Sequence, residues 1–171
     1  MPSRKPRLLE LDALMDRALR LLAVRAHSLG EIREKLKRCC ANPADVEAVV
    51  TKLKEMGYLN DKQFAESFAA GRRENEGFGK WRVLRDLRLR RVAPKLAEQA
   101  VEKTFKSSDE LQMIEDFLAR KYRGKELTSF LAEPKNLASA YRRLRYAGFS
   151  GGNSIRALKK YAKHADVLEE D

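Results

Sequence analysis

The chain has 171 residues, with 36 Lys and Arg against 25 Asp and Glu, and a formal charge of +11. This length suffices for one sizeable domain or a short array of small ones, and the charge favours an anionic partner such as nucleic acid, a membrane surface or an acidic protein face. No apolar run approaches the roughly 20 residues of a membrane span, and the N-terminus lacks the apolar core of a secretory signal, so we expect a cytoplasmic protein.

Apolar residues recur at the 3.6-residue spacing of an α-helix, without a convincing alternating strand pattern, which predicts an all-α protein. Three helices are expected in the first third of the chain. The first is marked by Leu14 and Ala18. The second begins at the capping-box pattern of Ser28 and Glu31. The third follows Asn42-Pro43 and ends near Gly57, which can adopt the left-handed conformation of a helix C-terminus.

The middle third of the chain predicts three more helices. Asn60 caps the fourth, in which Phe64 and Phe68 are spaced four residues apart. We expect this aromatic pair to lie in the core, because such a spacing usually packs a helix against its neighbours. The turn Gly77-Phe78-Gly79 precedes a basic fifth helix, and Pro94 starts the sixth.

The last third predicts a seventh, an eighth and a ninth helix. Ser107 or Ser108 precedes the seventh, and a looser stretch over residues 123–133 separates it from the eighth. Gly148 ends the eighth helix, and a glycine-rich turn leads to the ninth.

Nine helices fall into threes of about 50 residues, which is typical of a repeat protein whose units pack against their neighbours. We therefore expect an all-α, elongated array of three tandem three-helix repeats. The expected segments are a basic flexible tail over 1–12, repeats over 13–58, 59–106 and 107–165, and an acidic end over 166–171.

The most distinctive segment is 72–95, which holds nine Lys or Arg against three Asp or Glu. A charged helix face often serves only solvation, but such a face normally mixes the two signs at i,i+4 spacing, so we interpret the basic helix over 80–91 as a partner-binding surface. Trp81 could anchor an interface or lie half-buried in the core. The predicted binding residues are Arg72, Arg73, Lys80, Trp81, Arg82, Arg85, Arg88 and Arg91.

The sequence predicts no catalytic, cofactor or metal site. Cys39 and Cys40 are adjacent, form neither a disulfide framework nor a CxxC motif, and would point about 100° apart on a helix. With His27 and His164 they lack the spacing of a zinc site. No nucleophile elbow, phosphate-binding loop or carboxylate–histidine group is present.

Several motifs, in order, resemble the RecX regulatory protein family over about Asp16 to Tyr161. They include residues 25–28, the run 57–61 followed by Phe64 and Phe68, the turn 77–79, and residues 147–150. We expect the motif residues to hold the architecture in place, with Tyr58 packed between the first and second repeats. These residues are Gly57, Tyr58, Leu59, Asp61, Phe64, Phe68, Gly77, Gly79, Leu87, Gly148 and Phe149.

The resemblance implies a non-enzymatic regulator of the RecA recombinase in recombination, DNA repair and the SOS response. Members of the family bind the RecA filament on single-stranded DNA, suppress its ATPase and strand exchange, and promote its disassembly or block its growth. Because no dimerisation seam is evident and the chain is basic, we also expect a monomer that binds single- and double-stranded DNA weakly and without sequence preference. Exchanging Arg82 and Arg85 for Glu is expected to abolish inhibition and leave melting nearly unchanged.

This chain departs from the family pattern at the turns before and after its basic helix, and its Gly151-Gly152-Asn153 segment is one residue longer than the pattern. Lys80 replaces a usual proline, and Arg91 and Ala93 replace a usual glycine and serine, so we expect the second turn to rely on Pro94 and on packing. An alternative reading is a helix-turn-helix-like DNA-binding protein. It is weaker, because helix 81–91 offers Arg but neither Asn nor Gln to read base edges.

Overall fold

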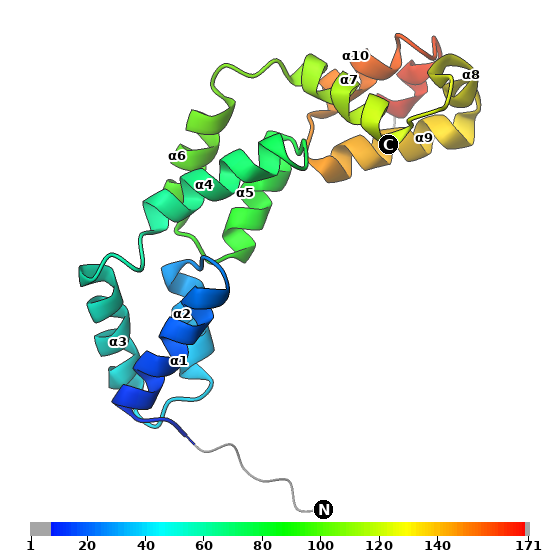
Figure 1. Ribbon diagram of the computed structural model, residues 1–171. Coiled ribbons are helices and arrows are strands. Elements are labelled where there is room, and N and C mark those ends of the chain that lie inside the picture. The colour runs from blue at the N-terminus through cyan, green and yellow to red at the C-terminus, as the bar shows by residue number, and fades with distance from the viewer. Residues whose placement is uncertain (1–7, 170–171) are drawn as a thin grey trace, which may run out of the picture. The chain divides into compact units, whose positions relative to one another are not determined.

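The computed structural model describes residues 8–169, and within that range the chain is all-α (Figure 1). The expected basic residues Arg4, Lys5 and Arg7 and the acidic residues Glu170 and Asp171 lie outside it. The elements are α1 (Leu11–Val24), α2 (Leu29–Lys37), α3 (Pro43–Glu55), α4 (Asp61–Glu74), α5 (Lys80–Leu89), α6 (Pro94–Phe105), α7 (Glu110–Lys121), α8 (Leu127–Ala132), α9 (Pro134–Ala147), α10 (Gly151–Leu158) and the 3₁₀ helix η1 (Ala165–Glu169).

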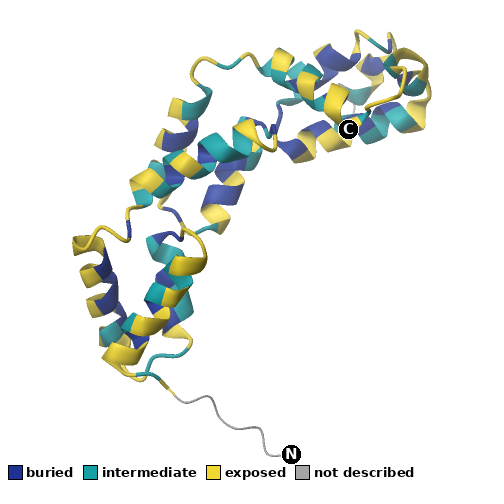
Figure 2. Cartoon of the chain, in the orientation of Figure 1, coloured by how far each residue is buried: buried dark blue, intermediate teal, exposed yellow. Residues whose placement is uncertain are grey.

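The chain divides into two compact units, and the division passes through α4, α5 and α6. Unit 1 comprises the chain up to Phe68 together with Leu87–Ala100, and unit 2 comprises Ala69–Asp86 and the chain from Val101 onwards. In both units the helices bury one face and expose the other (Figure 2). This pattern is what the apolar periodicity of the sequence predicts.

Unit 1 has a core built from α1, α2 and α3, and the predicted helix ends are confirmed there. The Ser28 hydroxyl accepts the Glu31 backbone N–H at 3.0 Å, and the Glu31 carboxylate accepts the Ser28 N–H at 3.2 Å. Asn42 caps α3, and Gly57 has the left-handed φ of 78°. The core residues are Leu14, Ala18, Ile32, Leu36, Val46, Val49, Val50, Leu53 and Leu59.

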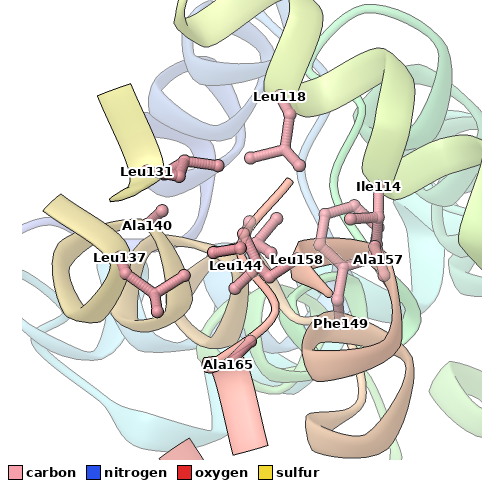
Figure 3. Close-up of a cluster of buried hydrophobic side chains, with 12 residues drawn as sticks. Ile114, Leu118, Leu131, Leu137, Ala140, Leu144, Phe149, Ala157, Leu158 and Ala165 are labelled. Atoms are coloured by element: carbon pink, nitrogen blue, oxygen red, sulfur yellow. The ribbon is translucent and has the colours of Figure 1, made fainter. Parts of the chain in front are cut away.

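Unit 2 has a second core between α7, α8, α9 and α10 (Figure 3). Its α8 occupies the stretch that we expected to be loose, and Leu131 within it is fully buried. Glu126 begins this helix by accepting the backbone N–H groups of Thr128 and Ser129, which lowers the pKa of Glu126 to about 2. A six-residue helix has too few positions to show a periodic pattern, so the sequence did not reveal it.

Three predicted boundaries are corrected. The flexible tail was placed as far as residue 12, but α1 begins at Leu11, and Leu9 exchanges backbone hydrogen bonds with Cys39 and Ala41 at 2.7 and 2.8 Å. Asp109 caps α7, rather than Ser107 or Ser108. The glycine-rich segment after Ser150 is not a turn, because α10 begins directly at Gly151.

In each unit, the C-terminal end of one helix meets the N-terminal end of another. In unit 2, the N–H groups of Gly79 and Trp81 donate to the carbonyls of Ala147 and Gly148 at 2.8 and 3.1 Å. Carbonyl groups at the end of α9 therefore accept hydrogen bonds from backbone N–H groups at the start of α5, which have no partner within α5. In unit 1, the Ser28 hydroxyl donates to the carbonyl of Arg90, just beyond α5. These contacts fix both ends of the basic helix.

Candidate partner-binding surface

The predicted binding residues lie on the last turn of α4, on α5 and directly after α5. Arg72 and Arg73 end α4, and Arg91 follows α5. The boundary between the units separates Asp86 from Leu87. The cations up to Arg85 therefore belong to unit 2, and Arg88 and Arg91 belong to unit 1.

Arg82 is held inside unit 2 and does not project freely into solvent. Its Nε donates to Asp86 at 3.0 Å, and its guanidinium carbon lies 4.8 Å from the Phe78 ring centroid and 4.4 Å from that of Tyr146. Burial opposes the charge, but the interactions with Tyr146 and Asp86 outweigh it and raise the pKa of Arg82. The side chain of Arg82 is only 16% exposed, so its main role is to stabilise the packing of unit 2.

Arg72 and Arg73 are also engaged within unit 2. Arg72 lies 3.7 Å from Asp86, which it shares with Arg82. Arg73 donates to the carbonyl of Thr104 at 3.1 Å and lies over the ring of Phe105. Both residues join the end of α4 to neighbouring elements of unit 2.

Three other cations form exposed ion pairs with carboxylates from outside the basic segment. The pairs are Lys80–Glu102 at 2.7 Å, Arg88–Glu98 at 3.3 Å and Arg91–Glu34 at 3.8 Å. These acids neutralise part of the positive charge of the segment. Its local composition had suggested that a partner alone would do so. Exposed pairs are weak, so a phosphate or a partner carboxylate can displace the internal acid.

Two predicted residues remain on the surface of unit 2. Trp81 is 59% exposed, so it does not lie half-buried in the core. Arg85 is exposed, lies 5.1 Å from the centroid of the Tyr146 ring, and has no carboxylate partner among residues 8–169. Tyr146 is itself 65% exposed. We call Trp81, Arg85 and Tyr146 the α5 patch.

The sequence gave no sign of Tyr146, because it lies 64 residues from Arg82 and no short-range pattern joins the two. Asp86, in contrast, is four residues after Arg82, and the i,i+4 rule for ion pairs could have identified it.

Several motif residues lie in the core or join helices, but the expectations for Tyr58, Phe64 and Phe68 need correction. Leu59, Leu87 and Phe149 are buried, and Asp61 accepts the N–H of Leu29 at 2.7 Å, joining the start of α4 to that of α2. Tyr58 was expected to pack between repeats, yet it is 56% exposed.

Phe64 and Phe68 stack on each other, with centroids 5.8 Å apart, but they are only half-buried. The expectation that they belong to the core was wrong. Their rings line a surface cavity of unit 1.

Comparison with known proteins gives the family. The models of the first and second RecX three-helix domains match residues 15–53 and 60–101. The regulatory protein RecX of Salmonella arizonae is 33% identical over 143 residues, covering 78% of this chain and 84% of the relative. That of Deinococcus radiodurans is 31% identical over 152 residues, covering 89% and 70%. The chain belongs to the RecX family.

Solved RecX structures share the fold. RecX from Lactobacillus salivarius superposes with a TM-score of 0.63 at 17% identity, over 88% of this chain and 96% of that one. A second RecX crystal structure gives the same TM-score at 18% identity, over 88% and 71%. These similarities confirm the predicted RecX resemblance and the tandem array of three-helix domains.

The departures from the RecX pattern at Lys80 and Arg91 have visible consequences. Lys80, in place of a proline, forms the ion pair with Glu102. Arg91, in place of a glycine, has a φ of 57° and is the one non-glycine residue with positive φ in the described chain. The turn has thus kept the left-handed conformation that a glycine would favour.

No group of three or more potential metal-ligating side chains occurs among residues 8–169. The described helices also include none with the length and apolar character needed to span a membrane.

Proposed function

We propose that this RecX-family chain is a non-enzymatic regulator that binds the RecA filament on single-stranded DNA, inhibits its ATPase and strand exchange, and modulates filament growth or disassembly. It acts in the cytoplasm, as a monomer, during recombination and DNA repair. Membership of the RecX family is the observation that carries this proposal. Direct contacts with DNA are weaker and independent of sequence.

The α5 patch supports the proposal as a contact surface. An exposed Trp, an exposed Arg and a Tyr are the residue types enriched where protein interfaces gain most of their energy. The exposed pairs of Lys80, Arg88 and Arg91 add cations that can change partners. Binding one filament state more tightly than another shifts the filament toward that state, so occupancy alone is enough to inhibit turnover.

The proposed domains are three repeats, of which the first begins with α1 at Leu11 and ends at residue 58, and the others cover 59–106 and 107–165. In this scheme the second repeat supplies the basic helix.

The test is the single-stranded-DNA-dependent ATPase of RecA, with this protein titrated well below the RecA concentration. We expect the wild type to inhibit at substoichiometric ratios, which indicates action on a filament rather than on free RecA. Arg85→Glu and Trp81→Ala should weaken inhibition while leaving the melting temperature unchanged, because both side chains are exposed.

Arg17→Glu is the matched control, since Arg17 is an exposed arginine of α1 and the charge change is identical. Equal inhibition by wild type and Arg85→Glu would remove the α5 patch from the mechanism. Absence of inhibition by the wild type would overturn the function itself.

A further inference from the structure

Unit 1 contains a surface cavity of about 590 Å³ that no part of the proposed mechanism uses. It lies between the segment before α2, the turn after α3 and the first half of α4. Its volume falls within the range of sites that hold small molecules. The lining residues are Arg25, Ala26, His27, Gly57, Tyr58, Asn60, Gln63, Phe64, Ser67, Phe68 and Arg90.

One wall of the cavity is aromatic. Phe64 and Phe68 stack with their ring planes 24° apart, and the guanidinium carbon of Arg90 lies 5.6 Å from the Phe68 ring centroid. Tyr58, on the preceding turn, adds a largely exposed ring. Rings gathered at a surface cavity, and not in the core, offer faces on which a flat group can stack.

The cavity is also positively charged. Arg25 and Arg90 both line it, and no Asp or Glu does. Glu31 binds the two guanidinium groups at 2.9 and 3.0 Å, so a single carboxylate is shared between two cations and positive charge remains in excess. Burial lowers the pKa of His27, whose Nδ1 lies 2.9 Å from the carbonyl oxygen of Arg25.

Polar side chains complete the lining. Asn60 and Gln63 carry amides, and Ser67 carries a hydroxyl. Asn60 uses its side-chain oxygen to accept the Gln63 backbone N–H at 3.0 Å, which holds the side chain in place and leaves its amide N–H groups as donors. Amide groups beside aromatic rings and arginines are the set with which proteins hold unpaired bases.

We propose that this cavity binds an unpaired base of single-stranded DNA, stacked against Tyr58 and Phe64, with the flanking phosphates on Arg25 and Arg90. An acidic protein segment would satisfy the arginines, but it would leave the ring faces and amides without a matching planar partner. The inference deepens the proposed function by assigning the contact with single-stranded DNA to named residues. It does not require RecA.

The test measures binding of a fluorescein-labelled oligothymidylate by anisotropy, without RecA, beside an abasic oligonucleotide of equal length. Tyr58→Ala and Phe64→Leu should weaken oligothymidylate binding about fivefold or more, as loss of one stacking partner does elsewhere. Tyr58→Phe keeps the ring and should bind like wild type. Binding of the abasic strand, which depends on phosphate charge alone, should be the same for all four proteins.

Because Tyr58 is exposed, its substitution stays interpretable even if Phe64→Leu fails to fold, and circular dichroism checks both. Equal weakening on the abasic strand, or no weakening on oligothymidylate, overturns the proposal. A synthetic peptide of Glu and Phe that binds more tightly than oligothymidylate would also overturn it and assign the cavity to a protein partner. RecA is absent from these assays, so a negative result leaves the ATPase test of the proposed function standing.

Photocrosslinking locates the site independently. An oligonucleotide carrying 5-iododeoxyuridine should crosslink to Tyr58, Phe64 or Phe68, as mapped by mass spectrometry. Crosslinks confined to Trp81 or Tyr146 would place the base on the α5 patch and contradict the assignment.

Discussion

The guanidinium carbon of Arg82 lies 4.4 Å from the centroid of the Tyr146 ring, a contact that joins α5 to α9 within unit 2. The same guanidinium donates to Asp86, whose side chain is only 10% exposed. Arg82, whose side chain is only 16% exposed, is therefore an organising residue of its unit.

Arg82→Ala should lower the free energy of unfolding by about 1–3 kcal/mol. The change removes the principal partner of a buried carboxylate and two ring contacts, and Arg72, at 3.7 Å, can compensate only in part. Urea denaturation measures the loss. Arg85→Ala is the control on the same helix and should stay within about 0.5 kcal/mol of wild type, because Arg85 is exposed. Equal losses for the two variants would contradict this division of roles.

The structure also changes the design of the charge-reversal experiment. From the sequence, exchanging both Arg82 and Arg85 for Glu was expected to spare the fold. A carboxylate at position 82 would instead face Asp86 at close range, so a loss of inhibition by that double variant could reflect unfolding. Arg85→Glu alone separates binding from stability.

Arg91→Gly should stabilise the protein by about 0.5–1 kcal/mol. Arg91 has a φ of 57°, which costs energy in any residue with a Cβ atom, whereas glycine adopts it readily. The ion pair that is lost, with Glu34 at 3.8 Å, is exposed and weak.

Thermal and urea unfolding measure the gain, and Arg91→Ala is the matched control. It loses the same ion pair but keeps the Cβ atom, so it should be no more stable than wild type. A gain of similar size in Arg91→Ala would show that the backbone is not the source.

Local chemistry explains which features the sequence could predict. The caps at Ser28, Asn42 and Asn60 are formed by hydrogen bonds within three residues, so their patterns could be found in the sequence. The predictions that failed concern contacts between residues far apart in the sequence. Phe64 and Phe68 have the spacing of a core stripe, but whether that stripe faces a core or a cavity depends on elements elsewhere in the chain.

The same limit applies to the binding surface. Composition identified the basic helix, but apart from Asp86 the acids that pair with it lie on α2 and α6, up to 59 residues away in sequence. Only the folded chain separates Arg82, which is enclosed, from Arg85, which is exposed.

Gly79→Ala should destabilise unit 2 by about 1–3 kcal/mol. A Cβ atom at this position would lie 2.5 Å from the carbonyl oxygen of Gly148 and 2.6 Å from its carbon, and these are backbone atoms that cannot rotate away. Relief requires α5 to move from α9, which weakens the hydrogen bond from the Trp81 N–H to Gly148.

Gly152→Ala is the control in the same unit. Gly152 lies in α10, and an added Cβ would have no atom within 4 Å, so alanine should stabilise the helix by up to about 1 kcal/mol. Urea denaturation of the two variants should therefore give shifts of opposite sign. An unchanged free energy of unfolding in Gly79→Ala would mean that α5 can move away from α9 at little energetic cost.

Glu31 forms ion pairs with two arginines of unit 1, Arg25 and Arg90. Burial raises its pKa, but hydrogen bonds from Arg25, Arg90 and the Ser28 N–H outweigh that effect, so the pKa is lowered from its ordinary value of 4.5. Between the folded and unfolded pKa values the unfolded state binds more protons than the folded state. The contribution of Glu31 is therefore complete above about pH 5 and is lost as the pH falls through the lowered pKa.

Glu31→Gln should lower the free energy of unfolding at pH 7 by about 1–2 kcal/mol, because an amide keeps the shape but removes the charge that holds both arginines. The difference from wild type should then shrink as the pH falls from about 5 to 3, since protonation abolishes the same charge in the wild type. Urea denaturation of both proteins across this range measures the effect. Glu55→Gln is the control, because Glu55 is an exposed residue at the end of α3 for which no ion pair is found within residues 8–169. Its free energy of unfolding should differ little from that of the wild type at every pH. An offset for Glu31→Gln that stays constant from pH 7 to 3 would show that the side chain acts through packing and not through its charge.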